Sequence, residues 1–417
     1  MSETFLPFLF DAAVAAANPL ILVPPFLPPR PKGRCVVIGA GKAAARMAQA
    51  VEEHMPGPLS GLVVTPYGHG VPCRQVRVLE AAHPIPDAAG ETAARRILHA
   101  VRGLAKDDLV LCLISGGGSA LLSLPAPSLT INDKRALTEA LLKSGAAISE
   151  INCVRKHLSA IKGGRLAAAA FPAKTLTLII SDVAGDNPEV IASGPTVADP
   201  TTIADAKAIL EKYAIDLPAA VASFLDTCSG ETPKLGDIRL SRAETVVTAT
   251  PRTALAAAAA AARNAGLEPT ILGDALEGES RDLARLQGRL AMQATAGEGR
   301  PGLLLSGGET TVTIRGNGRG GPNTEFILAL ALALDGQPET RAIACDTDGI
   351  DGGGDNAGAH ISPDTLSRAA KAGLNAAAML ENNDSYGFFS ALGDLVITGP
   401  TLTNVNDFRA ILIGDAG

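Results

Sequence analysis

Short apolar runs, each followed by a turn of small residues, recur along the chain. With their turns they occupy residues 34–50, 109–122, 175–186, 302–312 and 342–355. Runs of four to six apolar residues without polar alternation are typical of strands that are buried on both faces. Alanine-rich segments between many of them favour helices; these lie at 88–102, 253–265, 283–296 and 324–334. Alternation of strands and helices predicts an α/β protein with mostly parallel, Rossmann-like sheets.

A polar segment broken by Gly and Pro, residues 226–244, interrupts this pattern before a new apolar run begins at Thr245. A chain of 417 residues suits two or three domains. We therefore expect two packed α/β domains, at residues 1–240 and 241–417, with a cleft between them. Ligands of open α/β sheets bind outside the carboxyl ends of the strands, so the residues that follow the apolar runs are the candidates for chemistry.

Composition excludes several classes of partner. The net charge of −7 and the absence of Trp argue against a nucleic-acid-binding protein. The apolar stretch from Phe5 to Pro29 contains Asp11, Asn18 and several prolines, so neither a signal peptide nor a membrane span is expected. No C-x-x-C pair occurs among the six cysteines, which favours free thiols in the cytoplasm. They are Cys35, Cys73, Cys112, Cys153, Cys228 and Cys345.

The first candidate site is GAGKAA at 39–44, where Gly39 and Gly41 precede Lys42 between a predicted strand and a predicted helix. The pattern matches the weak dinucleotide fingerprint G-x-G-x-x-A. The acidic residue expected about 20 positions later is missing, since Pro66, Tyr67 and Gly68 follow the next apolar run. A lysine in this turn suits a phosphate or carboxylate. Anion binding is favoured, and an NAD(P)H-dependent oxidoreductase stays open as the alternative.

Two further glycine-rich segments can present backbone N–H groups to an anion at the start of a helix. SGGGSA begins at Ser115, and SGGET begins at Ser306 and adds Glu309. GNGRGGPNTE places Arg319 in a third flexible loop before another predicted helix, and an arginine there can make bidentate bonds to phosphate or carboxylate.

Aspartates also follow the predicted strands; they are Asp182, Asp186, Asp346, Asp348 and Asp351. Their hard oxygen atoms suit Mg²⁺ held together with substrate phosphates, although aspartate is also a common turn residue. The histidines form no metal-binding motif, and SGGGSA lacks the G-x-S-x-G spacing of a serine hydrolase. Lys156, Lys162 and Arg165 form a basic face that is expected to be solvated, with anion binding as the alternative.

Five long stretches, in order, resemble the MOFRL family of glycerate 2-kinases. They are SDVAGDNPEVIASGPTVADPTT, SGGET, GRGGPNTEFILALAL, DTDGIDGGGDNAGA and GDLVITGPTLTNVNDFRAILI. The resemblance extends from about residue 5 to 415 and implies Mg²⁺-dependent transfer of the ATP γ-phosphoryl group to D-glycerate, giving 2-phosphoglycerate and ADP. Some members of the family bear the name hydroxypyruvate reductase, which keeps the oxidoreductase alternative open. A small-anion sensor is the non-enzyme alternative.

The resemblance implies four catalytic residues, namely Lys42, Asp182, Glu309 and Arg319. The metal is expected at Asp182 and Asp348. Nucleotide contacts are expected from the loops, at Gly39, Gly41, Ser115, Gly116, Gly117, Gly118, Ser119, Ser306, Gly307, Gly308, Gly320 and Asn323. Two positions depart from the family pattern, Thr324 in place of Gln and Gly353 in place of Thr. The expected partners are D-glycerate and ATP, without nucleic acid or membrane, and a homodimer is compatible with the sequence.

Overall fold

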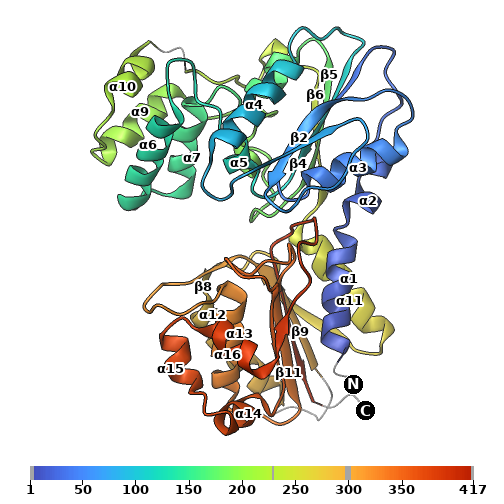
Figure 1. Ribbon diagram of the computed structural model, residues 1–417, viewed down its shortest axis with the longest axis vertical. Coiled ribbons are helices and arrows are strands. Elements are labelled where there is room, and N and C mark those ends of the chain that lie inside the picture. The colour runs from blue at the N-terminus through green and yellow to red at the C-terminus, as the bar shows by residue number, and fades with distance from the viewer. Residues whose placement is uncertain (1–3, 228–229, 296–301, 415–417) are drawn as a thin grey trace. The chain divides into compact units, whose positions relative to one another are not determined.

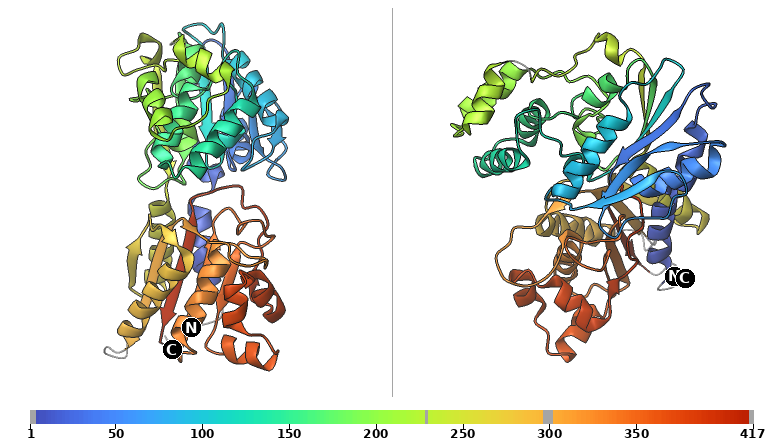
Figure 2. Two further views of the ribbon diagram at one scale, coloured as in Figure 1. Left: turned by 90° about the vertical axis from the view of Figure 1, so that its left-hand side faces the viewer. Right: turned by 45° about the horizontal axis from the view of Figure 1, so that its top comes forward.

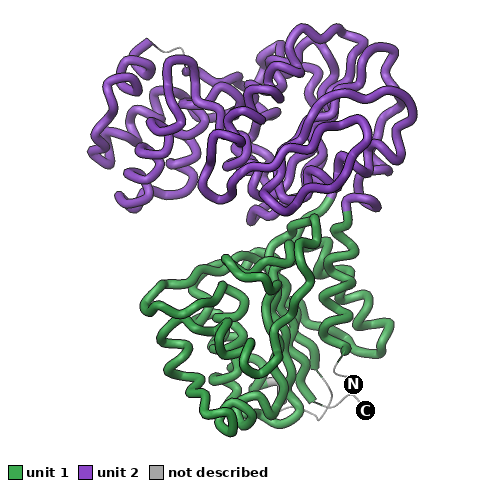
Figure 3. Tube along the Cα trace, in the orientation of Figure 1, with its two compact units in different colours: residues 1–18, 249–417 green, residues 19–248 purple. Residues whose placement is uncertain are grey.

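The computed structural model describes residues 4–227, 230–295 and 302–414, and the chain divides into two compact units (Figure 3). One unit is Pro19–Thr248; the other combines Met1–Asn18 with Ala249–Gly417. These ranges differ from the expected 1–240 and 241–417 for two reasons. The chain passes from one unit to the other after residue 248, and the first helix belongs to the C-terminal unit. That helix, α1 (Phe5–Ala16), packs against α11 (Pro251–Asn264).

The unit Pro19–Thr248 is built on a six-stranded sheet. Its strands are β1 (Cys35–Ala40), β2 (Ser60–Pro66), β3 (Arg77–Ala81), β4 (Leu109–Ile114), β5 (Lys174–Ile180) and β6 (Ala243–Ala249). The order is β3-β2-β1-β4-β5-β6, and the strands from β1 to β5 pair in parallel. All residues of β1 and β4 are buried, as their unbroken apolar runs predict. This is the strand order of a Rossmann-like sheet, which confirms the predicted fold class for this unit.

Helices cover this sheet and extend beside it (Figures 1 and 2). Those near the sheet are α2 (Pro19–Leu22), α3 (Ala44–His54), α4 (Ala88–Ala100), α5 (Gly118–Leu121) and α8 (Arg165–Ala170). Four others gather in one group beside it; they are α6 (Ile131–Lys143), α7 (Ile148–His157), α9 (Ile203–Lys212) and α10 (Ala219–Asp226). This group has a core of its own, which includes Leu137, Leu141, Val154 and Leu210.

The other unit contains a second six-stranded sheet of order β13-β12-β11-β14-β9-β7. Its strands are β7 (Pro269–Gly273), β9 (Gly302–Gly308), β11 (Thr340–Asp346), β12 (Gly358–Ile361), β13 (Leu395–Val396) and β14 (Asp407–Ile413). Only β7 and β9 pair in parallel, so the prediction that both sheets are mostly parallel was wrong for this one. The last strand, β14, lies between β9 and β11 and runs opposite to both, and a fully buried apolar run carries no signal of strand direction.

Helices flank both faces of this second sheet (Figures 1 and 2). The helices α1 and α11 lie on one face. The other face carries α12 (Ser280–Thr295), α13 (Pro322–Leu334) and α16 (Ser385–Leu392), with α14 (Thr365–Lys371) and α15 (Ala376–Glu381) nearby. Short strands β8 (Gly278–Glu279) and β10 (Thr310–Thr311) pair separately.

Among the residues that the structure describes, no single helix is long and apolar enough to cross a membrane. The bent pair Phe5–Ala16 and Pro19–Phe26 passes that test by length and composition only.

Candidate active site

The loops that follow β1 and β4 meet at the centre of the Rossmann-like sheet. Lys42 lies just after β1, and the Ser115–Ser119 loop follows β4, its parallel neighbour. From β1 the strand order proceeds to β2 and β3 on one side, and to β4, β5 and β6 on the other. The strand order thus reverses its direction between β1 and β4. A reversal of this kind opens a crevice outside the carboxyl ends of the two strands, where ligands of this fold bind. The structure therefore brings Lys42 and the SGGGSA segment together.

Hydrogen bonds tie these two loops to each other. The amide N–H of Lys42 donates to the carbonyl oxygen of Gly116 at 2.8 Å, and that of Ala43 donates to Ser115 Oγ at 2.9 Å. Gly41 has a φ of +135°, and a Cβ there would lie 2.2 Å from Ser115 Oγ. Glycine is thus required at this position because the two turns approach closely. The half-buried Lys42 is held on a rigid backbone at the crevice.

Ser119, at the far end of the SGGGSA segment, is the meeting point of several polar side chains. Its Oγ lies 2.8 Å from Ser193 Oγ and 2.8 Å from Lys162 Nζ, and it accepts a hydrogen bond from Arg155 Nη2 at 3.3 Å. Lys162 Nζ also donates to the carbonyl oxygen of Ser119 at 2.7 Å. Sequence reasoning missed Arg155 and Ser193; the dense run of basic residues from 155 to 165 was the available signal.

The basic face expected to be solvated is buried. Lys162 is only 1% exposed. Lys156 Nζ forms an ion pair with Asp199 at 3.0 Å, and Arg165 donates to the carbonyl oxygens of Lys156 and Gly230. The expectation was wrong because α7 packs against α6, α9 and residues 191–193 instead of facing solvent. Lys156 and Arg165 are structural anchors, whereas Lys162 points to Ser119.

Asp182 follows β5, the strand next to β4, so it belongs to the same edge of the sheet. The side chain is half-buried. Its carboxylate oxygens are of the kind that suits Mg²⁺ bound jointly by protein and phosphate. In the described part of the chain, no group of three or more His, Cys, Asp or Glu residues is arranged to hold a metal by itself.

In the C-terminal unit, the SGGET segment differs from the expected loop. Ser306, Gly307 and Gly308 end strand β9 and pair with β14, and β10 follows instead of a helix. Ser306 Oγ is buried and hydrogen-bonded to the side chain of Gln287. The backbone N–H and C=O groups of this segment are therefore used largely in the hydrogen bonds of the sheet. Glu309 is exposed and follows the end of β9. The nucleotide contacts expected from this segment stay a prediction.

The helix expected after GNGRGGPNTE is present as α13, and its N-terminus already holds an anion from the chain itself. The Asp351 carboxylate accepts hydrogen bonds from the amides of Asn323 and Thr324, each at 2.8 Å, and from Thr324 Oγ1 at 2.7 Å. The Asn323 side chain turns inward and donates to Asp407 at 2.6 Å. Burial raises the pKa of Asp351 to about 6. Thr324 thus helps to seat Asp351 beneath the helix.

Arg319 lies on the surface before this helix, with its side chain 55% exposed. The guanidinium lies 3.7 Å from the centre of the Tyr386 ring, and Nη2 lies 3.3 Å from Asp355 Oδ1. Tyr386 donates to the same carboxylate at 2.8 Å. This exposed arginine is thereby oriented before any ligand binds, and cation–π contact adds to its orientation.

The remaining expected residues of this unit lie in turns. Asp348 is 2% exposed and accepts a hydrogen bond from the amide of Ile350 at 2.7 Å. Gly320 packs so closely that a Cβ there would lie 2.2 Å from Ser385 Oγ. The metal role of Asp348 and the nucleotide role of Gly320 stay predictions.

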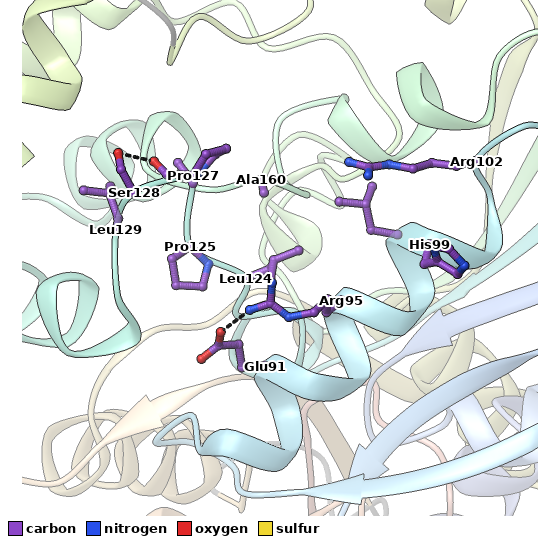
Figure 4. A pocket seen from close by; sticks show the side chains of 12 residues that line it. Glu91, Arg95, His99, Arg102, Leu124, Pro125, Pro127, Ser128, Leu129 and Ala160 are labelled. Carbon is purple, nitrogen blue, oxygen red and sulfur yellow. Dashed lines mark hydrogen bonds and ion pairs between the residues drawn. The ribbon is translucent and has the colours of Figure 1, made fainter.

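A separate pocket of about 360 Å³ lies between α4 and residues 124–129 (Figure 4). Arg95, His99 and Arg102 line it, and Arg95 pairs with Glu91 at 2.6 Å. None of the predicted site residues lines this pocket, which is distinct from the crevice at the carboxyl ends of β1 and β4.

Comparison with known proteins identifies the family. Residues 6–226 match the model of a domain of unknown function, DUF4147, and residues 302–407 match that of the MOFRL family. A protein of Agrobacterium vitis that bears the provisional name of a hydroxypyruvate reductase is 58% identical over 97% of this chain and 93% of its own length. The D-glycerate 2-kinase of Thermotoga maritima is 40% identical over 96% of each chain.

A solved structure agrees with these sequence comparisons. The crystal structure of the glycerate kinase of Thermotoga maritima superposes with a TM-score of 0.89 at 38% identity, covering 98% of this chain and 99% of that one. The chain belongs to the glycerate kinase family that combines a DUF4147 domain with a MOFRL domain.

Proposed function

We propose that the protein is a glycerate 2-kinase, which transfers the γ-phosphoryl group of ATP to the 2-hydroxyl of D-glycerate. The observation that carries this proposal is the crevice at the carboxyl ends of β1 and β4, where Lys42 and the SGGGSA loop meet. A lysine and a glycine-rich loop at this point of a Rossmann-like sheet suit a phosphate ligand. The glycerate kinase names of relatives from several organisms support the same reaction.

Phosphoryl transfer depends mainly on positioning and on charge stabilisation. The 2-hydroxyl oxygen forms a bond to the γ-phosphorus while the bond to the bridging oxygen breaks, and ADP leaves with that oxygen. Lys42 neutralises charge on the transferring group, and Asp182 accepts the hydroxyl proton or holds the metal. The carboxylate of Asp182 fits Mg²⁺, which would supply further neutralisation of phosphate charge. Arg319 and Glu309 are assigned to substrate and metal-water contacts.

A reductase is the second candidate, because the Agrobacterium vitis relative bears that provisional name and because the sheet has the Rossmann order. Dinucleotide-binding sheets of this kind place an acidic residue after the second strand to bind the ribose. Here β2 ends at Pro66, and Tyr67 and Gly68 follow. The kinase is therefore the better supported function.

The decisive experiment incubates purified protein with D-glycerate, ATP and Mg²⁺ and follows the products by ³¹P NMR. We expect a 2-phosphoglycerate resonance that is absent without protein and without Mg²⁺. A 3-phosphoglycerate resonance would keep the kinase and contradict the regiochemistry. Absence of phosphoryl transfer, together with oxidation of NADH or NADPH by hydroxypyruvate, would establish the reductase instead.

We also propose that the enzyme acts in the cytoplasm, since the described cysteines Cys35, Cys73, Cys112, Cys153 and Cys345 are free thiols. Cys228 lies outside the described residues. A homodimer stays a prediction that sedimentation analysis would test.

A further inference from the structure

Two basic side chains contact Ser119, a third acts on one of them through its charge, and no acidic partner for these three lies in the described part of the chain. Arg155 from α7 and Lys162 from the following turn both reach Ser119 Oγ, at 3.3 and 2.8 Å. Lys134 from α6 is the third member, and its charge acts on Lys162 together with that of Arg155. Among the residues that the structure describes, none of the three forms an ion pair. The charge of the nearby Lys156, by contrast, is balanced by the carboxylate of Asp199.

Lys134 is the most informative member of this group. The side chain is 93% buried, being 7% exposed, and Nζ has no hydrogen-bond partner in the described structure. Burial, with the positive charges of Arg155 and Arg165, lowers the pKa of Lys134 to about 7. An unpartnered buried ammonium is costly. Its retention next to two other cations indicates a ligand that completes the group.

A purely structural role accounts for Lys162 alone. Lys162 Nζ donates to the carbonyl oxygen of Ser119, and this contact fixes the end of the SGGGSA loop. Within the described residues, the same role leaves Lys134 Nζ without a hydrogen-bond partner and gives the Arg155 guanidinium a single hydrogen bond, to Ser119. The backbone of Ala192 and Ser193 beside them has φ values of +51° and +61°, and such left-handed conformations in residues other than glycine concentrate at ligand sites.

We infer that Lys134, Arg155 and Lys162 form a binding site for the polyphosphate chain of the nucleotide. This inference rests on the proposed function and extends it to residues outside the four catalytic ones. Three cations match the several negative charges of a polyphosphate better than the single charge of a carboxylate. Arginine binds phosphate oxygens in bidentate fashion, and the Ser119 hydroxyl can donate to another oxygen. Loop β4–α5 thereby links this site to the crevice that contains Lys42.

The test uses the full-length protein and inorganic triphosphate as the probe, with binding measured by calorimetry. Lys134→Met is expected to weaken triphosphate binding and to raise KM for ATP, each by at least about tenfold, because a charge-assisted bond is lost. KM for D-glycerate should stay unchanged. The matched control is Lys143→Met, which removes an exposed lysine from the same helix and should alter neither constant.

Thermal unfolding of the ligand-free variant separates a binding role from a structural one. If Lys134 serves a ligand, replacing an unpartnered buried cation with methionine leaves the Tm unchanged or raises it. A lowered Tm would make Arg155→Gln the deciding variant, and unchanged triphosphate affinity in that protein would overturn the inference.

Four other results are decisive. Unchanged triphosphate affinity in a stable Lys134→Met protein, or no triphosphate binding by the wild type, overturns the site. A rise in KM for glycerate alone overturns the assignment to polyphosphate and assigns the group to a carboxylate. Since calorimetry needs no turnover, triphosphate binding by a wild-type protein without kinase activity would support the site and contradict the proposed function.

Discussion

At the scale of single residues, Lys42 combines a rigid backbone with a position at the carboxyl edge of the sheet. We expect Lys42→Ala to lower kcat/KM at least about tenfold, equivalent to about 1.4 kcal/mol of transition-state stabilisation. Steady-state kinetics with ATP and D-glycerate measures the effect. Lys106→Ala is the control, because Lys106 is exposed and precedes β4 at the opposite edge. Wild-type turnover in a folded Lys42→Ala protein would remove Lys42 from the mechanism.

Lys134 also predicts a pH dependence of stability in the ligand-free protein. Its pKa is about 7 in the folded chain and 10.5 in the unfolded chain, so between these values the unfolded state binds the extra proton. The free energy of unfolding attributable to Lys134 therefore rises with pH from about 7 to about 10.5, and is constant below.

Denaturant unfolding of the wild type and Lys134→Met across pH 6 to 11 measures this contribution together with the change that loss of the Lys134 charge makes at Lys162. We expect the advantage of the methionine variant to be largest near pH 6 and to vanish above about pH 10.5. A difference that does not change with pH would show that Lys134 keeps an ordinary pKa in the folded protein.

At the scale of elements, the buried strands were predictable and the polar turns less so. The runs of β1 and β4 are apolar throughout, so their boundaries follow from the sequence, as does the meeting of Lys42 with the SGGGSA loop. The SGGET segment was expected to form a phosphate-binding loop, but it ends strand β9 where that strand pairs with β14. Small residues suit both situations, so the sequence does not distinguish them. The inward turn of Asn323 and the cation group beside Ser119 depend on contacts between distant segments, which no local pattern encodes.

The N-terminus of α13 shows how such a distant contact stabilises an element. We expect Asp351→Ala to lower the free energy of unfolding by about 2 kcal/mol, because the amides of Asn323 and Thr324 lose their acceptor and each such loss costs about 1–3 kcal/mol. Relief of a buried charge offsets part of this cost. Denaturant unfolding measures it.

Asp355→Ala is the control for this prediction, since Asp355 lies in the same loop and is exposed. Its surface contacts with Arg319 and Tyr386 should contribute little to stability. An Asp351→Ala protein as stable as this control would mean that the helix N-terminus does not depend on the carboxylate.

At the scale of the whole molecule, the chain passes between the two units twice, near residue 18 and near residue 248. The first helix is therefore distant in sequence from the unit it stabilises. Phe10 on α1 is buried, with its ring centre 5.9 Å from that of Phe408 on β14. The Thr403 hydroxyl donates to the carbonyl oxygen of Ala17, which fastens the end of the same segment.

We accordingly expect Phe10→Ala to destabilise the C-terminal unit by about 3–5 kcal/mol, the usual cost of removing a buried phenylalanine ring. Hydrogen exchange should accelerate in α11, β11 and β14 and stay unchanged in β1, β4 and β5, because α1 packs against α11, β11 and β14 of its own unit. Phe8→Ala, which truncates a side chain that is 53% exposed on the same helix, should change neither region. Faster exchange in β1 and β4 of the Phe10→Ala protein would contradict the assignment of α1 to the C-terminal unit.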